Sequence, residues 1–219
     1  MATQLPGSSS SSAAKSVAPL SSIATQRLKR ELVRLQTDPP PGIAAYLSDD
    51  NDDLSKWTAQ ITGPVDSPFE GTIFNISMII PSRYPMEPPV CQFTSPIPYH
   101  PNIDEAGRIC LDTLKRPPTG LWSPAVNLTV VLLSLQSLLQ EPNPDDGLLP
   151  DVSRLYRDNR QGWWDEAKRR LIVTAANSAK QAKANTESNE KRNAPVVMVA
   201  EQPENETKES PDSKRLKTG

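Results

Sequence analysis

Three residues in one short segment have side chains that could take part in catalysis. Cys110 follows the only histidine, His100, and Asn102 lies between them. A cysteine thiolate can attack an activated acyl group, hold it as a thioester and leave when an amine attacks. An asparagine cannot titrate, so Asn102 cannot act as a general base. The segment is therefore a candidate catalytic site with Cys110 as the candidate nucleophile.

A metal site, a Cys–His pair and a simple turn are the alternatives for the same segment. A zinc site pairs its ligands at close spacing, whereas Cys91, His100 and Cys110 are about ten residues apart and lack a fourth ligand, so we expect no metal. A Cys–His nucleophile pair needs the imidazole beside the sulfur and a third orienting group, and the sequence leaves that alternative open. For Asn102 the plainer alternative is a turn residue that bonds its own backbone.

The two cysteines have different surroundings. Free cysteine is among the most buried residue types, and Cys91 alternates like a core-facing strand residue within Val90-Cys91-Gln92-Phe93. Cys110 instead lies among four charged residues, Asp104, Glu105, Arg108 and Asp112. We therefore expect Cys91 in the core and Cys110 at the surface.

The composition excludes several classes of protein. The 219 residues are 36% hydrophobic and 23% charged with a formal net charge of -2, which lacks the positive face that binding to nucleic-acid backbones needs. No run of about 18 apolar residues could span a membrane, and residues 1–20 lack the hydrophobic region of a signal peptide. Two cysteines cannot form a disulfide framework. We expect a soluble, intracellular chain with protein partners and no direct contact with nucleic acid or membrane.

The elements that must position the site follow from apolar spacing and proline. An amphipathic helix is predicted from Ile23 to Leu35, and Pro39 must end it. The broad apolar face from Leu128 to Leu139 predicts a buried helix. Alternating stretches separated by turn residues predict an antiparallel meander of four strands near 43–46, 56–61, 71–80 and 90–94. Further helical patterns cover 152–158 and continue from residue 163 into the tail. The order indicates an α+β fold.

The compact part of the chain is predicted to be one domain. Residues 1–20 are Ser-rich with too little apolar material to order, and we expect a disordered arm. Residues 21–175 form the predicted core, and 176–219 a flexible tail that is partly helical at its start. Within the core, the residues between Thr94 and Leu128 show no periodicity, and a loop of that length is usually functional.

Several short motifs occur together in one order. They are Tyr84-Pro85-x-x-Pro88-Pro89, His100-Pro101-Asn102, Cys110 with Leu111-Asp112, Trp122-Ser123-Pro124 and Pro142-Asn143-Pro144-Asp145-Asp146. In type, order and approximate spacing they resemble the ubiquitin-conjugating enzyme family, from about Ala24 to Lys168. Four extra residues around Pro117 to Gly120 make the chain most similar to the T-type branch, whose members monoubiquitinate substrates in DNA interstrand crosslink repair.

The resemblance implies roles for the residues of the long loop and the turn after the buried helix. Cys110 would accept ubiquitin as a thioester, Asn102 would stabilise the oxyanion, and Asp146 would orient and deprotonate the incoming lysine. The alternative for Asp146 is that it caps, with Asp145, the helix predicted near Leu148 to Leu155. His100, Pro101 and Asp112 would shape the active site, and Lys115, five residues after the nucleophile, is a candidate for self-modification.

The resemblance also implies partner surfaces. Arg27, Lys29 and Arg30 match a basic helix face that meets the ubiquitin-activating enzyme, the alternative being an ordinary solvated face. Four residues match the two loops that contact RING-type ligases: Pro85, Met86, Ser123 and Pro124. The family often has Phe in place of Met86, so a ligase contact is expected without identifying the ligase.

Two other functions stay open at this point. A non-catalytic adaptor of the same fold would bind ubiquitin without the cysteine, and a conjugating enzyme could carry another ubiquitin-like modifier. We expect no cofactor, because ATP is used upstream by the activating enzyme, and a monomer, the usual form in the family. The basic run from Lys214 to Lys217 favours the nucleus, with the cytoplasm as a second location.

Overall fold

The computed structural model describes residues 19–48 and 52–192, with side chains as far as residue 180. Helix α1, Ser22–Thr37, begins where the Ser21 hydroxyl accepts a hydrogen bond from the Ala24 backbone N–H at 3.1 Å, a typical N-cap. It ends just before the prolines that start at Pro39. Its apolar side, Ala24, Leu28 and Leu35, is buried, as the spacing predicts.

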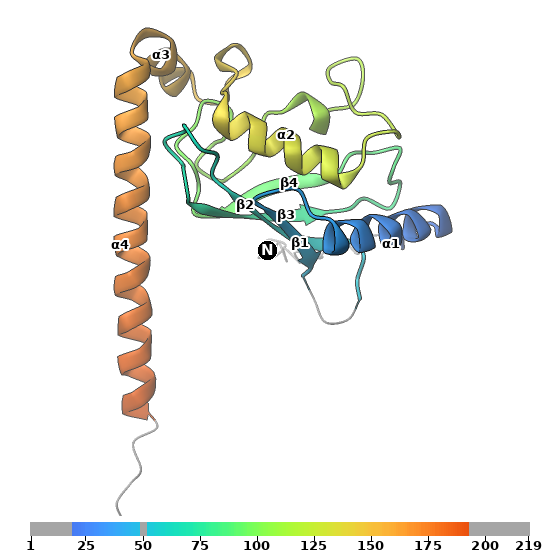
Figure 1. The fold of residues 1–219 in the computed structure, drawn as a ribbon, viewed down its shortest axis with the longest axis horizontal. Helices are drawn as coiled ribbons and strands as arrows, with labels where there is room; N and C mark the ends of the chain where they lie inside the picture. Colours follow the sequence, from blue (N-terminus) through green and yellow to red (C-terminus); the bar gives the residue numbers. More distant parts are fainter. Residues whose placement is uncertain (1–18, 49–51, 193–219) are drawn as a thin grey trace, which may run out of the picture. The chain divides into compact units, whose positions relative to one another are not determined.

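The four predicted strands form one antiparallel sheet in the order β1-β2-β3-β4 (Figure 1). Their bounds are Ile43–Leu47, Lys56–Thr62, Ile73–Ile79 and Val90–Ser95. Along β2 and β3 every second residue is buried, and Ile61 pairs with Phe74, so one face of the sheet is apolar. The predicted meander is confirmed.

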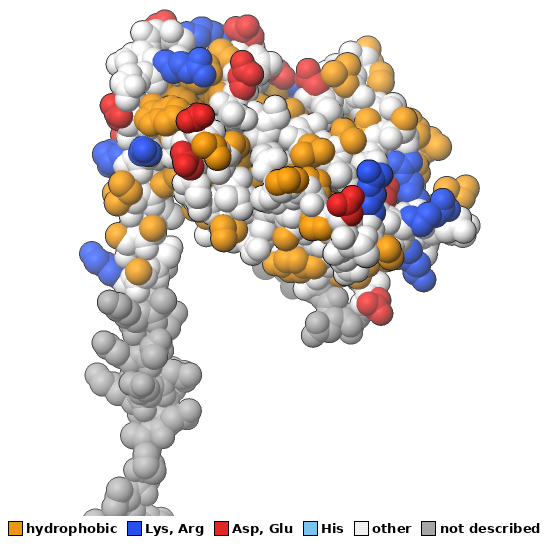
Figure 2. Space-filling view, in the orientation of Figure 1, with side chains coloured by type: hydrophobic (Ala, Val, Ile, Leu, Met, Phe, Trp, Pro, Cys, Tyr) orange, Lys and Arg blue, Asp and Glu red, His pale blue; other side chains and the backbone are white. Residues whose placement is uncertain are grey.

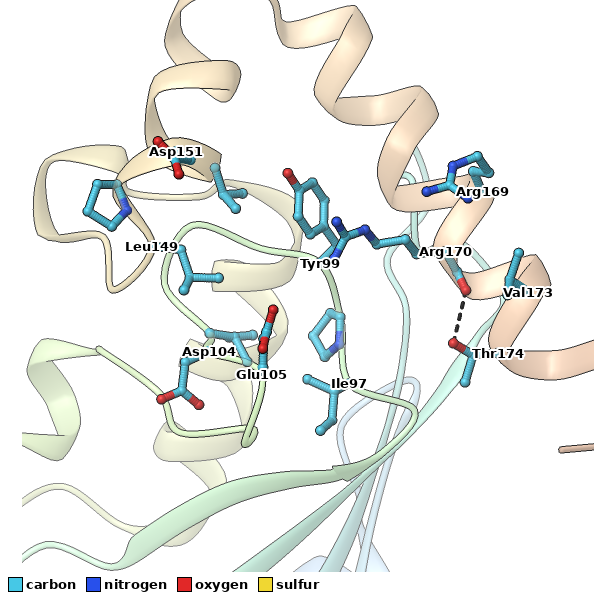
Figure 3. Close-up of a pocket in the computed structure, with 14 residues that line it drawn as sticks. Ile97, Tyr99, Asp104, Glu105, Leu149, Asp151, Arg169, Arg170, Val173 and Thr174 are labelled. Atoms are coloured by element: carbon cyan, nitrogen blue, oxygen red, sulfur yellow. Dashed lines mark hydrogen bonds between the residues drawn. The ribbon is translucent and has the colours of Figure 1, made fainter. Parts of the chain in front are cut away.

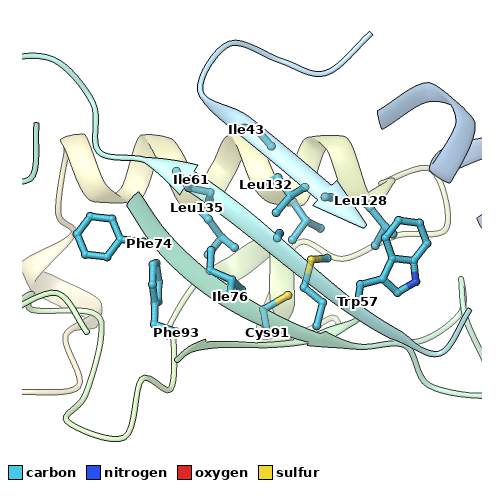
Figure 4. Close-up of a cluster of buried hydrophobic side chains, with 14 of the residues drawn as sticks. Ile43, Trp57, Ile61, Phe74, Ile76, Cys91, Phe93, Leu128, Leu132 and Leu135 are labelled. Carbon is cyan, nitrogen blue, oxygen red and sulfur yellow. The ribbon is translucent and has the colours of Figure 1, made fainter. Parts of the chain in front are cut away.

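Helix α2, Leu128–Gln140, covers this apolar face of the sheet (Figure 1). The side chain of Asn127 caps it by accepting from the Val130 backbone N–H at 3.0 Å. Figure 4 shows Leu128, Leu132 and Leu135 directed toward the sheet, and all three are fully buried. Each such side chain contributes about 1.5–3 kcal/mol relative to an exposed one. The end of α2 forms one wall of the candidate site, because Leu138 and Cys110 line the same cavity.

Two helices close the domain, α3 at Pro150–Asp158 and α4 at Arg160–Arg192. Trp163 anchors the start of α4, with its ring edge-on to Tyr156 at 4.9 Å and to Phe69 at 6.0 Å between centroids. The chain divides into two units between Ser178 and Ala179, so the first 19 residues of α4 belong with the core unit.

The tail that we expected over 176–219 is helical as far as Arg192. Residues 193–219, with the predicted import signal, lie outside the described residues, as do residues 1–18 of the predicted arm. Among the described helices, none is long and apolar enough to cross a membrane.

The long segment between β4 and α2 is irregular, as predicted, with one short 3-10 turn, Asp112–Leu114. It is joined to the edge of the sheet, because the Phe93 N–H donates to the Gly107 carbonyl at 2.9 Å and the Gln92 side chain donates to the Ala106 carbonyl at 2.6 Å. Gly107 has φ +80°, and a Cβ there would lie 1.9 Å from the Phe93 carbonyl oxygen. Only glycine permits this close approach, which holds the chain three residues before Cys110 against β4.

Candidate active site

Cys110 lies on the irregular segment, and its thiol is partly exposed. The Cys110 N–H donates to the Asn102 carbonyl at 2.9 Å, which fixes the nucleophile beside the His100-Pro101-Asn102 turn. Its Sγ donates to Asp146 Oδ2 at 3.1 Å, although 36 residues separate them in sequence. Cys91, by contrast, is buried on β4. Cys110 is therefore the thiol that a macromolecular partner can reach.

Asn102 is buried, and its whole side chain is engaged. Its Nδ2 donates to the carbonyls of Asn143 at 2.7 Å and Asp146 at 3.0 Å, and its Oδ1 accepts from the Asn143 N–H at 2.9 Å. The alternative that it bonds only its own local turn is wrong, since its partners are 41 and 44 residues away. In this arrangement the amide holds the 143–146 turn beside Cys110, and both donors are occupied.

His100 is fully buried and neutral. Its Nδ1 accepts from the Asn102 N–H at 3.0 Å, so its Nε2 carries the hydrogen and donates to the Leu138 carbonyl at 2.8 Å. Burial lowers its pKa to about 4. The ring thus joins α2 to the active-site loop rather than activating Cys110, and the Cys–His alternative loses its basis. The neighbouring Pro101 is also buried, and its carbonyl accepts from the N–H groups of Leu148 and Leu149.

Asp146 belongs to a 3-10 turn, Pro144–Asp146, and does not cap the following helix. The alternative of an N-cap cluster is wrong, because the N-cap of α3 is Leu149 and no side chain bonds there. Gly147 and Leu148 separate the two aspartates from this N-cap. Asp145 instead pairs with Arg157 at 2.8 Å, which leaves Asp146 facing the thiol.

Lys115 completes the polar cluster around Cys110. Its Nζ lies 2.5 Å from Asp146 Oδ2 and 3.3 Å from Asp112 Oδ1. Asp112 is thus placed near the active site through Lys115, and its backbone carbonyl also accepts from the N–H groups of Lys115 and Leu121.

The cluster shifts the pKa values of its members in opposite directions. Partial burial and then the Asp146 carboxylate raise the pKa of the Cys110 thiol, and Lys115 opposes them. Hydrogen bonds from Lys115 and Cys110 lower the pKa of Asp146. The Asp146 carboxylate, followed by Cys110, raises the pKa of Lys115. At neutral pH the resting site therefore holds a thiol, a carboxylate and an ammonium.

A cavity of about 320 Å3 opens beside Cys110, and its apolar wall includes Leu111, Leu121 and Leu138. A larger cavity of about 620 Å3 lies away from the thiol, between the loop after β4 and helix α4 (Figure 3). There the Arg170 guanidinium stacks over the Tyr99 ring at 4.0 Å. Neither Cys110 nor Asp146 lines the larger cavity, so its size does not mark the reacting centre.

The predicted basic face of α1 is only partly free. Figure 2 shows Lys and Arg side chains gathered over this helix, where Lys29 and Arg30 are exposed. Arg27 differs, because it pairs with Glu31 at 2.7 Å and donates to the carbonyls of Pro124 and Val126. Arg27 thus ties α1 to the predicted ligase loop.

The two predicted ligase loops lie together. Met86 is 61% exposed, and Ser123 and Pro124 are exposed as well. Pro85 is buried, so it supports this surface rather than contacting a partner. Its carbonyl accepts from Trp122 Nε1 at 2.9 Å, a bond that joins the two loops.

Two structural contributors were not predicted from the sequence. Asn143 exchanges hydrogen bonds with Asn102, although its motif gave it no role. Glu31 accepts from the Tyr84 hydroxyl and from the Leu128 N–H, both at 2.8 Å. The available signal was that Glu31 is the one acidic residue in the basic sequence of α1.

The fold and this site match a known family. Residues 27–171, more than half of the chain, match the family model described as ubiquitin-conjugating enzyme, and the protein belongs to that family. The α+β fold and the resemblance are therefore confirmed. The chain is an enzyme that conjugates ubiquitin, which sets aside the adaptor alternative.

Relatives give a narrower similarity. The chain is similar to proteins named Ubiquitin-conjugating enzyme E2 T. The Xenopus laevis protein is 54% identical over 144 residues, 65% of this chain and 73% of that protein. The Homo sapiens protein is 50% identical over 142 residues, which are 65% of this chain and 71% of that protein. The Danio rerio protein is 48% identical over 143 residues, which are 65% of this chain and 72% of that protein. Membership of the family implies ubiquitin, an activating enzyme, a ligase and a substrate lysine as partners.

Proposed function

We propose that this enzyme carries ubiquitin as a thioester on Cys110 and transfers it to a substrate lysine with a RING-type ligase, in the repair of DNA crosslinks. The observation that carries the site assignment is the partly exposed Cys110 thiol, 3.1 Å from the Asp146 carboxylate, in a chain whose other cysteine is buried. The similarity to E2 T proteins supports the branch, and the exposed Met86 supports the ligase.

The proposed chemistry is two acyl transfers. In charging, the Cys110 thiol loses its proton and its sulfur attacks the ubiquitin thioester on the activating enzyme, whose thiol leaves as the new C–S bond forms. In discharge, the ammonium of the acceptor lysine first releases a proton to solvent, the resulting amine attacks the same carbonyl carbon, the C–S bond breaks and Cys110 leaves as a thiolate. The nitrogen then releases its extra proton to solvent, and an isopeptide bond remains.

Asp146 acts mainly by orienting the incoming amine. Its pKa is lowered, so the carboxylate stays ionised and attracts the ammonium form of a lysine to the side of the thiol. A carboxylate with a lowered pKa is a weak proton acceptor, which makes the orienting part of the predicted role the better supported one.

Asn102 acts first by holding the 143–146 turn that presents Asp146. Stabilising the oxyanion as well would require one of its two Nδ2 hydrogen bonds to be exchanged during the reaction. Under this proposal no metal or small-molecule cofactor takes part, ATP is consumed by the activating enzyme, the protein acts as a monomer, and the nucleus is the favoured location.

Charging tests the nucleophile. Wild type, Cys110→Ser and the matched control Cys91→Ser are each incubated with ubiquitin, activating enzyme and ATP, then separated with and without reductant. We expect a reductant-sensitive adduct on wild type and Cys91→Ser, and a reductant-stable adduct or none on Cys110→Ser. An unchanged reductant-sensitive adduct on Cys110→Ser would refute the assignment. If no adduct formed with ubiquitin and one formed with another ubiquitin-like modifier, that modifier would be the cargo of the enzyme.

Discharge with a RING ligase tests the ligase surface. Met86→Ala should weaken ligase-stimulated discharge and leave charging intact, whereas Val65→Ala, at a comparably exposed residue outside both loops, should change neither. Equal effects of the two variants on discharge would contradict the assignment of Met86 to a ligase-contacting surface. For the pathway, cells that carry only Cys110→Ser should become sensitive to a DNA-crosslinking agent, and normal survival would contradict that part of the proposal.

A further inference from the structure

The amine of Lys115 occupies the place that a substrate lysine needs. Its Nζ is 2.5 Å from the Asp146 Oδ2 atom that also accepts from Cys110 Sγ at 3.1 Å. A second carboxylate oxygen, Asp112 Oδ1, lies 3.3 Å from the same Nζ. Only 30% of the Lys115 side chain is exposed. The chain thus places its own lysine head group between the active-site carboxylates, beside the nucleophile.

An acceptor lysine has the same chemical group and requires the same position. Its nitrogen must come within about 3–3.5 Å of the thioester carbon, which is bonded to Cys110 Sγ. The carboxylate best placed to attract it there is Asp146, and Asp146 is already paired. An incoming lysine must therefore exchange with Lys115 before it can react.

We infer that Lys115 is a specificity-determining residue that competes with acceptor lysines for Asp146 and so favours acceptors delivered by a bound partner over free amines. The inference rests on the proposed thioester chemistry. A tethered side chain acts at an effective concentration in the millimolar range. Free lysine at lower concentration is excluded, whereas a lysine held in place by a ligase–substrate complex exchanges readily.

The ion pairs that hold Lys115 also keep it from reacting. An ammonium has no lone pair for attack on a thioester, and pairing with Asp146 raises the pKa of Lys115, which a further hydrogen bond with Asp112 raises again. Any lysine at Asp146 must lose a proton before it attacks, and an acceptor that pairs with Asp146 alone is held in the ammonium form less firmly than Lys115. Lys115 can thus occupy the position without being acylated at each turnover. Competition and the predicted self-modification are different outcomes of the same placement, and they respond differently to substitution.

Discharge of the purified ubiquitin thioester onto free lysine distinguishes competition by Lys115 from self-modification of Lys115. Lys115→Gln removes the positive charge, so we expect the KM for free lysine to fall about fivefold, the upper end for a partly exposed ion pair, with kcat little changed. Lys115→Arg keeps a cation that pairs with carboxylates and cannot be acylated, so it should behave like wild type. Lys168→Gln, an exposed lysine on α4, is the matched control.

A neutral acceptor provides the second readout. Hydroxylamine is uncharged at neutral pH and does not need Asp146, so Lys115→Gln should not accelerate its reaction with the thioester. An unchanged KM for lysine in Lys115→Gln would overturn the inference. Equal acceleration of both acceptors would also overturn it, because it would indicate a more reactive thioester. If the thioesters on Lys115→Arg and Lys115→Gln both outlived the wild-type thioester, self-modification would account for the difference from wild type and competition would be refuted.

The thioester is quantified before each discharge, as a reductant-sensitive adduct. Failure to form it would count against the proposed function and not against competition by Lys115.

Discussion

Replacement of Asn102 by alanine tests whether this side chain serves the loop or the reaction directly. The substitution removes three hydrogen bonds, two donated to the carbonyls of Asn143 and Asp146 and one accepted from the Asn143 N–H. At about 1 kcal/mol each, the free energy of unfolding should fall by about 3 kcal/mol. The 143–146 turn would lose its attachment, and discharge onto lysine should slow with it.

Urea unfolding followed by tryptophan fluorescence measures the first effect. With a denaturant slope of about 2 kcal/mol/M, the midpoint should fall by about 1.5 M with the slope unchanged. The matched control is Asn75→Ala, which loses two side-chain hydrogen bonds in the sheet, with Gln60 and Ser95, and should be destabilised without slower discharge. An Asn102→Ala enzyme with the midpoint of wild type but no discharge would refute the reasoning, because its amide would then act on the reacting atoms alone.

Three other predictions concern the site and the core. Asp146→Asn removes a group that raises the pKa of Cys110, so the thiol pKa should fall, and iodoacetamide alkylation in a Cys91→Ser background should become faster at pH 7; a slower reaction would contradict the assigned electrostatics. His100 has a folded-state pKa of about 4 against 6.5 for the unfolded chain, so its contribution to stability is present above pH 6.5 and is lost as the pH falls toward 4. From this residue alone, the free energy of unfolding should drop by about 2 kcal/mol between pH 7 and pH 5. Because the chain has one histidine, a proton NMR titration of its ring signal reports this pKa directly. A measured pKa near 6.5 would contradict the burial of His100 as its cause. Leu135→Ala should cost about 2–5 kcal/mol in urea unfolding, and a cost under 1 kcal/mol would show that α2 is not packed as described.

The fold was accessible from the sequence because its signals are local. Alternation along β2 and β3, the stop at Pro39 and the apolar face of α2 each depend on neighbours within a few residues, and tertiary packing agrees with them. The position of Cys110 followed from the same kind of signal, since charged neighbours and an aperiodic segment favour a surface loop.

The internal geometry of the site could not be predicted from the sequence, because it depends on contacts between segments that are distant along the chain. The carbonyl partners of the Asn102 amide lie 41 and 44 residues further along the chain. Asp146 pairs with Lys115, from which 31 residues separate it in sequence. Two aspartates before a helix are ordinarily capping residues, yet Pro144 begins a separate turn and removes Asp146 from that role. The burial of Pro85 depends likewise on Trp122, which only the folded chain brings into contact with it.

The attachment of the active-site segment to β4 also affects how the enzyme behaves in a crowded solution. β4 is at one edge of the sheet, and an edge strand with free N–H and carbonyl groups can pair with a strand from another molecule. Residues 106–108 cover part of that edge, through the bonds from Gln92 and Phe93 and the pairing of Gln92 with Arg108. The segment that presents the nucleophile therefore also shields the sheet from self-association. A substitution at Gly107 that loosened it would cost solubility as well as activity.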